Sequence, residues 1–307
     1  MRRPVAAEGP QRARARKTIR VWLIPIVTGF VFVVLCAGQL SARAPARRII
    51  SLVPALTEML FAIGAGPQVV AVSSFDTDPP PVNQLPKVGA LLDPDVERIL
   101  SLQPDLVLIY ASQVDLLQQL ARADIAAFSY RHGGLAHITN TIRSLGDRTG
   151  HAREAAQVAD DLERRLQHIR TLVASRPKLR TMLVFGRQAQ SLRQIYVSGG
   201  RGFLHDLLDT AGGINVFADI GTESVEASTE LVLARAPDVI LELRVTDIPS
   251  ADEMANEIAS WRPIASVPAV RAGRVHILTG RDLVVPGPRV ADAAERMARA
   301  LHPESFK

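Results

Sequence analysis

One sequence pattern occurs twice in this chain, and it limits the folds that the chain can adopt. Residues 97–109 read Glu-Arg-Ile-Leu-Ser-Leu-Gln-Pro-Asp-Leu-Val-Leu-Ile, and residues 230–242 read Glu-Leu-Val-Leu-Ala-Arg-Ala-Pro-Asp-Val-Ile-Leu-Glu. Each block has a Glu, an apolar helical turn, a Pro-Asp pair that begins seven residues after the Glu, and then an apolar strand. The repeat indicates two similar lobes, and two lobes imply a cleft in which a ligand would bind.

Short apolar strands alternate with helices through most of the chain after residue 47. This alternation favours the α/β fold class, with parallel sheets that helices cover on both faces. The predicted strands are residues 48–53, 69–72, 106–110, 126–130, 181–185, 239–243 and 274–277. The predicted helices, apart from one long helix, are residues 57–63, 93–102, 116–123, 203–211, 229–235, 251–258 and 289–301.

The long helix is predicted between the two halves. Residues 152–173 contain neither Gly nor Pro, and apolar residues recur there at spacings of four, four, three and four. These residues are Val158, Leu162, Leu166, Ile169 and Val173. They form one stripe on a helix of about six turns. We interpret it as a rigid connection between two lobes; the alternative is the largest helix of a single α/β domain. The predicted organisation is residues 1–46 as a signal segment, 47–150 as an N-terminal lobe, 151–175 as the linker helix and 176–307 as a C-terminal lobe.

The positive charge of the chain lies at its start and not on its globular part. The net charge is +5, but residues 1–46 carry eight Lys/Arg and one acidic residue, whereas the remainder carries 28 basic and 30 acidic residues. The globular part therefore lacks the basic field that phosphate binding needs, which argues against a nucleic-acid partner.

The basic start precedes an uncharged run at residues 21–41 and then Ala44-Pro45-Ala46. A basic segment, an apolar segment and an A-x-A site are typical of a bacterial export signal, so the mature chain would begin near Arg47. Because the run is about twenty residues long, an uncleaved anchor in the inner membrane is the alternative. Either way, the globular part is expected in the periplasm.

The only cysteine, Cys36, lies within the apolar run. We interpret it as another apolar residue of the signal, and lipidation is the alternative. The exported part is therefore expected to have no disulfide and no thiolate metal site.

Several further motifs lie along the exported part. In the first half they are Arg48-Ile-Ile-Ser-Leu-Val-Pro-Ala-Leu-Thr-Glu58, Val72-Ser-Ser-Phe-Asp-Thr-Asp-Pro-Pro80, Leu85-Pro-Lys-Val-Gly89 and the Glu97 block. In the second half they are Tyr196-Val-Ser-Gly-Gly200, Ala211-Gly-Gly-Ile-Asn-Val-Phe217, the Glu230 block and Pro288-Arg289. Together these motifs closely resemble those of periplasmic cobalamin-binding and iron-siderophore- or haem-binding proteins of ABC importers. The resemblance covers nearly all of residues 47–303 and is nearest to the cobalamin-binding branch. It implies two Rossmann-like lobes with parallel sheets joined by one long helix, the class III periplasmic binding protein fold.

The resemblance also implies a function and a partner. It implies a monomeric substrate-binding protein, not an enzyme, that needs no cofactor and clamps cobalamin or a related corrinoid between its lobes. A ferric siderophore or haem is the alternative ligand. In the family, a surface Glu of each lobe docks onto arginines of a dimeric permease, and Glu97 and Glu230 hold the matching positions. Two carboxylates on rigid helices suit such charge-assisted pairing, although a single Glu in the first turn of a helix also favours the helix dipole.

The ligand is expected at the carboxyl ends of the strands and in the loops that follow them. Matching this chain to the cobalamin-binding pattern implies Pro54, Phe75, Leu91, Tyr196, Ser224 and Asp282 as ligand-binding residues. Phe75 and Tyr196 suit packing on a flat macrocycle. However, Leu91 and Ser224 stand where that pattern has tryptophans. Two residues at the ends of predicted strands join the set: Arg187, as a partner for ligand carboxylates, and Tyr110, which with Tyr130 is a candidate axial ligand for haem.

Two further classes fit the sequence less well. Related zinc and manganese receptors have a His soon after the first strand, whereas Pro54 and Ala55 follow it here, and the seven His are scattered. No metal ligands are therefore predicted. A membrane-anchored enzyme that acts in the cleft is the second class, but the chain has no G-x-S-x-G elbow, no P-loop and no HExxH motif.

Overall fold

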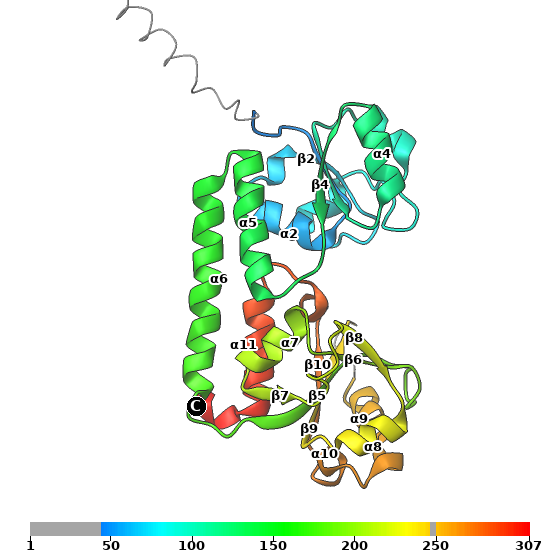
Figure 1. The fold of residues 1–307 in the computed structure, drawn as a ribbon, viewed down its shortest axis with the longest axis vertical. Coiled ribbons are helices and arrows are strands. Elements are labelled where there is room, and N and C mark those ends of the chain that lie inside the picture. Colours follow the sequence, from blue (N-terminus) through cyan, green and yellow to red (C-terminus); the bar gives the residue numbers. More distant parts are fainter. Residues whose placement is uncertain (1–43, 246–249) are drawn as a thin grey trace, which may run out of the picture. The chain divides into compact units, whose positions relative to one another are not determined.

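The computed structural model describes residues 44–245 and 250–307 (Figure 1). The apolar run at residues 21–41 and Cys36 lie outside the described residues. Within the described ranges, no helix is both long and apolar enough to cross a membrane.

The N-terminal lobe is built on a sheet of four parallel strands in the order β2-β1-β3-β4. Its strands are β1 (Ile49–Ser51), β2 (Val69–Val72), β3 (Leu106–Tyr110) and β4 (Ala126–Tyr130). The helices outside the linker region are α2 (Pro54–Ala62), α3 (Val96–Ser101) and α4 (Val114–Arg122), with 3₁₀ helices η1 (Gly66–Gln68) and η2 (Pro80–Gln84). Ile, Leu and Val dominate the inner strands because both faces of the sheet are covered. All four strands therefore end at the same edge of the sheet, where a ligand site is expected.

The C-terminal lobe contains a six-stranded sheet in the order β10-β9-β5-β6-β8, with β7 paired to β5. Its strands are β5 (Leu179–Gly186), β6 (Ile195–Ser198), β7 (Gly213–Asn215), β8 (Ser224–Ala227), β9 (Val239–Arg244) and β10 (Val275–Thr279). The helices are α7 (Phe203–Thr210), α8 (Thr229–Arg235), α9 (Ala251–Ala259), α10 (Pro268–Arg271) and α11 (Val290–Leu301), with η3 (Arg262–Ile264), η4 (Arg281–Val284) and η5 (Pro303–Phe306).

This second sheet is mixed, which corrects the prediction of a parallel sheet in each lobe. Strand β6 runs antiparallel to both β5 and β8. The segment between β5 and β6, residues 187–194, contains no helix and is too short for the crossover that parallel neighbours need. Strands β6, β7 and β8 were not predicted from the sequence.

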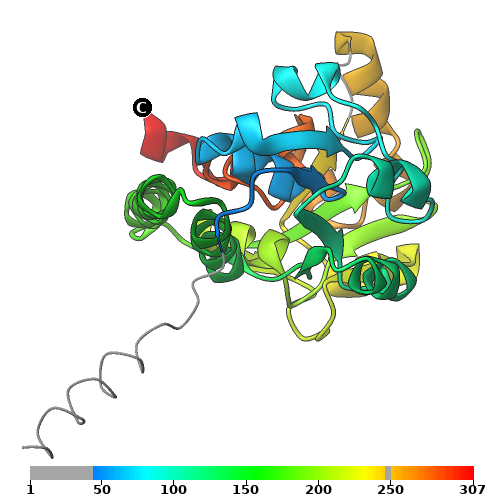
Figure 2. The ribbon, with the colours of Figure 1, turned by 90° about the horizontal axis from the view of Figure 1, so that it is seen from above.

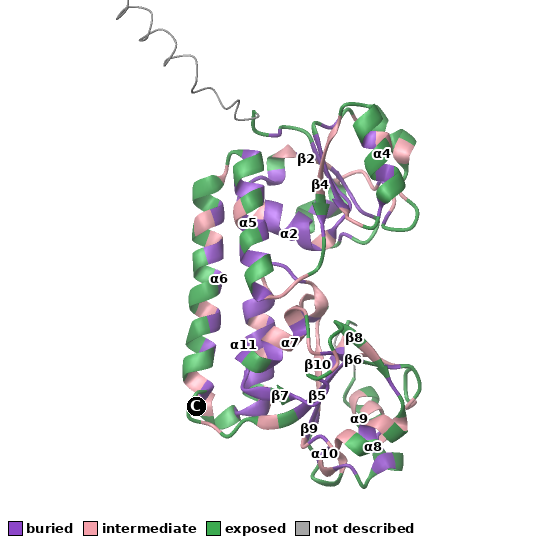
Figure 3. Cartoon of the chain, viewed as in Figure 1, coloured by how far each residue is buried: buried purple, intermediate pink, exposed green. Residues whose placement is uncertain are grey.

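The predicted long helix is present as α6 (Ala152–Val173). Four of the five residues of its predicted apolar stripe are buried, and Val158 is half-buried. The buried side of α6 is visible in Figure 3.

Helix α6 is paired with a helix that the sequence analysis missed, α5 (Leu135–Thr149). Figure 2 shows the two helices end-on and side by side. Gly146 permits the close approach, because a Cβ there would lie 2.3 Å from the Cβ of Ala155. Gly150, with φ of 79°, ends α5 in the left-handed conformation and lets the chain reverse into α6. The connection is therefore part of a helical hairpin, and α11 also packs on α6.

Candidate functional site

Two adjoining cavities lie where residues of both lobes meet. The first, of about 570 Å³, is lined by residues 110–112 and 130–132, at the carboxyl ends of β3 and β4, and by Glu223 of the C-terminal lobe. The second, of about 240 Å³, shares His132 and Glu223 with the first. Its other lining residues are Phe185, Arg201, Gly202, Phe203, Leu204, Ser224 and Val284. We call the two cavities together the interlobe cleft.

Aromatic rings gather on the N-terminal side of this cleft. The His132 ring centroid lies 5.7 Å from that of Tyr110 and 5.4 Å from that of Tyr130, and the rings of His132 and Tyr130 are nearly perpendicular. Burial raises the pKa of both phenols, so both stay protonated at neutral pH. Burial also lowers the pKa of His132, which keeps the imidazole neutral. These three rings are therefore polarizable and uncharged, which suits contact with a large conjugated ligand.

The structure brings two of the predicted ligand-binding residues to the cleft. Tyr110 lines the first cavity and Ser224 lines the second. Phe75, Leu91 and Tyr196 are exposed but line neither cavity.

The other three predicted residues lie elsewhere. Pro54 is the half-buried first residue of α2. Asp282 lies in η4, where its carboxylate pairs with Arg296 at 3.4 Å. The side chain of Arg187 has no exposed surface and is paired with two carboxylates of its own lobe, so we leave it out of the proposed site.

Most residues that line the cleft were not predicted from the sequence, and His132 and Glu223 show why. His132 comes two residues after β4, at the edge of the parallel sheet, and this position was a usable signal. Glu223 directly precedes β8, a strand that the sequence analysis did not predict, so no local pattern pointed to it. Among the described residues, no cluster of three or more His, Cys, Asp or Glu is arranged to hold a metal ion.

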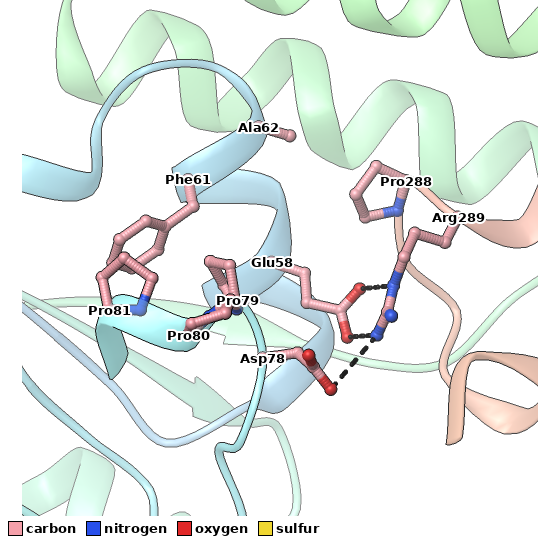
Figure 4. Close-up of a pocket in the computed structure, with 9 residues that line it drawn as sticks. All are labelled: Glu58, Phe61, Ala62, Asp78, Pro79, Pro80, Pro81, Pro288 and Arg289. Carbon is pink, nitrogen blue, oxygen red and sulfur yellow. Dashed lines mark hydrogen bonds and ion pairs between the residues drawn. The ribbon is translucent and has the colours of Figure 1, made fainter. Parts of the chain in front are cut away.

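A separate cavity of about 520 Å³ lies beside a charged link between the lobes (Figure 4). Arg289 donates two hydrogen bonds to the carboxylate of Glu58, at 2.7 and 3.0 Å, and lies 3.7 Å from Asp78. Burial raises the pKa of Glu58 even though Arg289 opposes this change. A second link joins the lobes at α5, where Asp206 accepts a hydrogen bond from the amide of Leu135 at 2.9 Å. Both contacts stabilise the present arrangement of the lobes.

A buried carboxyl lies close to the cleft and gives the protein a pH-dependent stability. Asp76 accepts a hydrogen bond from the amide of Ser73 at 2.9 Å, but its Oδ1 has no hydrogen-bond partner among the described residues. Burial raises the pKa of Asp76 to about 6. The folded protein binds the Asp76 proton more tightly than the unfolded chain does. Protonated Asp76 therefore makes its full contribution to the free energy of unfolding below pH 4. This contribution is lost as the pH rises to about 6.

We therefore expect Asp76→Asn to stabilise the protein at pH 7.5 by about 3 kcal/mol, because the amide never becomes charged. The gain should disappear as the pH falls from 6 to 4. Urea unfolding between pH 4 and 8, followed by fluorescence of the buried Trp261, measures it. A gain that stays constant over this pH range would contradict the assignment.

The two repeated blocks adopt the same structure in both lobes. Glu97 lies in the first turn of α3, and Glu230 lies in the first turn of α8. A side chain caps the start of each helix: Asp95 accepts from the amide of Arg98 at 3.0 Å, and Ser228 accepts from the amide of Leu231 at 3.2 Å. Both glutamates are exposed, and neither forms an ion pair with another described residue.

The ends of these two helices are also fixed in the same way. Arg48, next to β1, donates to the carbonyl of Leu102 at 2.6 Å, and Arg180 of β5 donates to the carbonyl of Arg235 at 2.7 Å. In each lobe the residue before the Pro of the repeat is left-handed, with φ of 46° at Gln103 and 44° at Ala236. Residues other than glycine rarely adopt this backbone conformation. Its recurrence at equivalent positions shows how closely the two blocks match.

Comparisons with known proteins agree with this architecture. Residues 49–281 match a family model described as periplasmic binding protein. The vitamin B12-binding protein of Yersinia pseudotuberculosis serotype O:1b (strain IP 31758) is 32% identical over 254 residues, which are 81% of this chain and 85% of that protein.

Two solved structures are similar over most of the chain. The periplasmic vitamin B12 binding protein BtuF of Vibrio cholerae has a TM-score of 0.72 and 29% identity, and the match covers 86% of this chain and 99% of that one. The periplasmic heme-binding protein RhuT from Roseiflexus sp. RS-1 has a TM-score of 0.69 and 27% identity, with coverages of 85% and 99%.

These relatives are binding proteins and not enzymes, which confirms the prediction of a non-enzymatic role. The predicted α/β fold with two lobes and a long helix is also confirmed, apart from the mixed second sheet. The chain therefore belongs to the periplasmic binding protein family, in the group that includes vitamin B12-binding and haem-binding proteins.

Proposed function

We propose that this chain is the exported binding protein of an ABC importer, that it binds cobalamin or a related corrinoid in the interlobe cleft, and that it docks on a dimeric permease. The observation that carries the proposal is the cleft itself, which joins the carboxyl ends of two parallel strands to the opposite lobe beside a wall of aromatic rings. The similarity to vitamin B12-binding proteins supports a corrinoid as the ligand. Docking through Glu97 and Glu230 is part of the proposal and rests on the matched geometry of α3 and α8.

The chemistry of the cleft suits a corrinoid. The neutral rings of Tyr110, Tyr130 and His132 offer flat apolar surface, and Phe185 and Phe203 add more from the C-terminal lobe. Corrinoids also carry amide side chains around their rim. The cleft supplies both hydrogen-bond donors and acceptors for such groups, from Arg131, Arg201 and Glu223.

Haem is the second candidate ligand, and one observation favours it. Tyr110 lies in the first cavity, where a phenol is in place to become an axial ligand if iron displaces its proton. The similarity to RhuT supports this alternative.

We expect the purified protein to retain cyanocobalamin, but neither haem nor a ferric siderophore, after gel filtration. The visible absorption spectrum identifies the retained compound, and calorimetric titration gives the affinity. Tyr110→Ala should weaken binding at least tenfold, since about 1.5–3 kcal/mol of apolar contact is lost when an aromatic ring is removed.

Phe306→Ala serves as the matched control, because Phe306 is an aromatic residue of η5 that lines neither cavity of the cleft. The affinity of the Phe306→Ala variant for cyanocobalamin should equal that of the wild type. Retention of haem alone would replace the corrinoid by the second candidate, and retention of no compound would overturn the proposed ligand class.

A further inference from the structure

Each of the two matched helices carries an exposed leucine beside its glutamate. Leu100 follows Glu97 by three residues, and Leu233 follows Glu230 by three residues. Residues three apart lie on the same face of a helix. Leu100 is 37% exposed and Leu233 is 40% exposed, whereas Ile99 and Val232, the residues before them, are fully buried. The helices thus keep one apolar side chain for the core and present the next one to solvent.

A single exposed leucine needs no explanation, since folded proteins have many. Two exposed leucines at equivalent positions of two lobes are different, because each lies one turn from an exposed carboxylate without an ion pair in the described part of the chain. The helices that carry them are capped at one end and held by an arginine at the other. Each Glu–Leu pair is therefore presented on a rigid base, so little conformational entropy would be lost when a partner binds.

We propose that Leu100 and Leu233 are docking residues, and that each inserts into an apolar socket next to a basic side chain of the partner. This inference rests on the proposed docking through Glu97 and Glu230. The partner it fits has two equivalent sites, one for each lobe, as a permease of two like subunits has. The carboxylate fixes register and speeds association, and the leucine excludes water around the ion pair and supplies affinity.

The test measures binding of fluorescently labelled protein to right-side-out inner-membrane vesicles from the organism that encodes this chain. Leu100→Ser and Leu233→Ser should each weaken binding about tenfold, and the double variant about a hundredfold, since the sites are independent. The matched controls are Leu117→Ser in α4 and Ile258→Ser in α9, residues that are 37% and 38% exposed. Both controls should bind as the wild type does.

Three outcomes would overturn parts of the proposal in different ways. If the double leucine variant binds like the controls while Glu97→Lys/Glu230→Lys does not bind, the leucines are not docking residues but the glutamates are. If the double charge reversal binds normally, docking through the glutamates fails. If sedimentation shows a dimer that only the double leucine variant loses, the occupant is a second copy of this chain and the socket on the partner is excluded.

Salt provides an independent readout. The effect of the charge reversal should shrink when the salt concentration rises to 1 M, because the Debye length then falls to about 3 Å. The effect of the leucine variants should persist, since burial of apolar surface is not screened. If the binding defects of the charge-reversal and leucine variants depended equally on salt, a separate apolar contribution to binding would be contradicted.

Discussion

Replacing Arg187 by methionine is expected to lower the free energy of unfolding by about 3 kcal/mol, because it removes one of the two cations that pair with two carboxylates inside the C-terminal lobe. The Nε of Arg187 lies 3.0 Å from Glu242, and its NH2 group lies 2.7 Å from Glu257. The side chains of Arg187 and Glu242 are 0% and 1% exposed. Urea unfolding at neutral pH measures the loss.

The surroundings of Arg187 explain why it is structural. Its guanidinium lies over the ring of Trp261, 5.2 Å from the centroid, and the indole N–H of Trp261 donates to Glu242 at 3.0 Å. Arg244 supplies the second cation for the two glutamates, with its nitrogen 2.6 Å from Glu242. This network links β5 and β9 to α9 and to the turn that holds Trp261, so its loss should loosen one side of the C-terminal lobe.

Arg281→Met is the control for this experiment, since Arg281 also follows a strand but is exposed. It should change the stability by no more than about 0.5 kcal/mol. The competing hypothesis, in which Arg187 binds a ligand carboxylate, makes the opposite prediction for Arg187→Met: unchanged stability and weaker ligand binding. Measuring both quantities on both variants separates the two roles.

The sequence predicted the elements whose pattern is local and strong. Helix α8 was predicted with its observed bounds, and the apolar stripe of α6 was assigned almost completely. Helix α5 was missed although Leu135, Ile138, Ile142 and Leu145 recur at helical spacing. Its segment begins with two glycines and contains Gly146, and these residues favour a loop when each is judged by its own propensity. In the folded protein Gly146 serves the packing of α5 on α6, which is a tertiary reason that no local pattern reveals.

The site was harder to predict because it depends on distant residues. The alternation of strands and helices correctly placed Tyr110 at the edge of the sheet. It did not show that Glu223, more than a hundred residues later, completes the same cavity, because β8 was not recognised. Arg187 illustrates a different limit. Its position after β5 was predicted, but the direction of its side chain depends on Glu242 and Glu257, which only the fold brings together.

Reversing the charge of both glutamates, with Glu97→Lys and Glu230→Lys, is expected to reduce uptake of radiolabelled cyanocobalamin by about a hundredfold or more in cells that lack the wild-type protein. Each exposed carboxylate faces the partner in the proposed complex, and the reversal both removes a charge pair and places two cations opposite each other. The Glu230 backbone amide and the Ser228 hydroxyl lower the pKa of the Glu230 carboxyl. That carboxyl is therefore ionised at neutral pH. Affinity for cyanocobalamin in solution should not change, because both helices lie outside the cleft.

The matched control is the double variant Asp115→Lys and Asp252→Lys. These are also exposed acidic residues in the first turns of helices, α4 in one lobe and α9 in the other, so the change in net charge and in helix-dipole energy is the same. This control should transport normally. Because the two sites act on one rigid protein, each single reversal should leave partial uptake and the two effects should combine. A single reversal as severe as the double would instead mean that one lobe alone carries the docking, and normal uptake by the double variant would exclude docking through these residues.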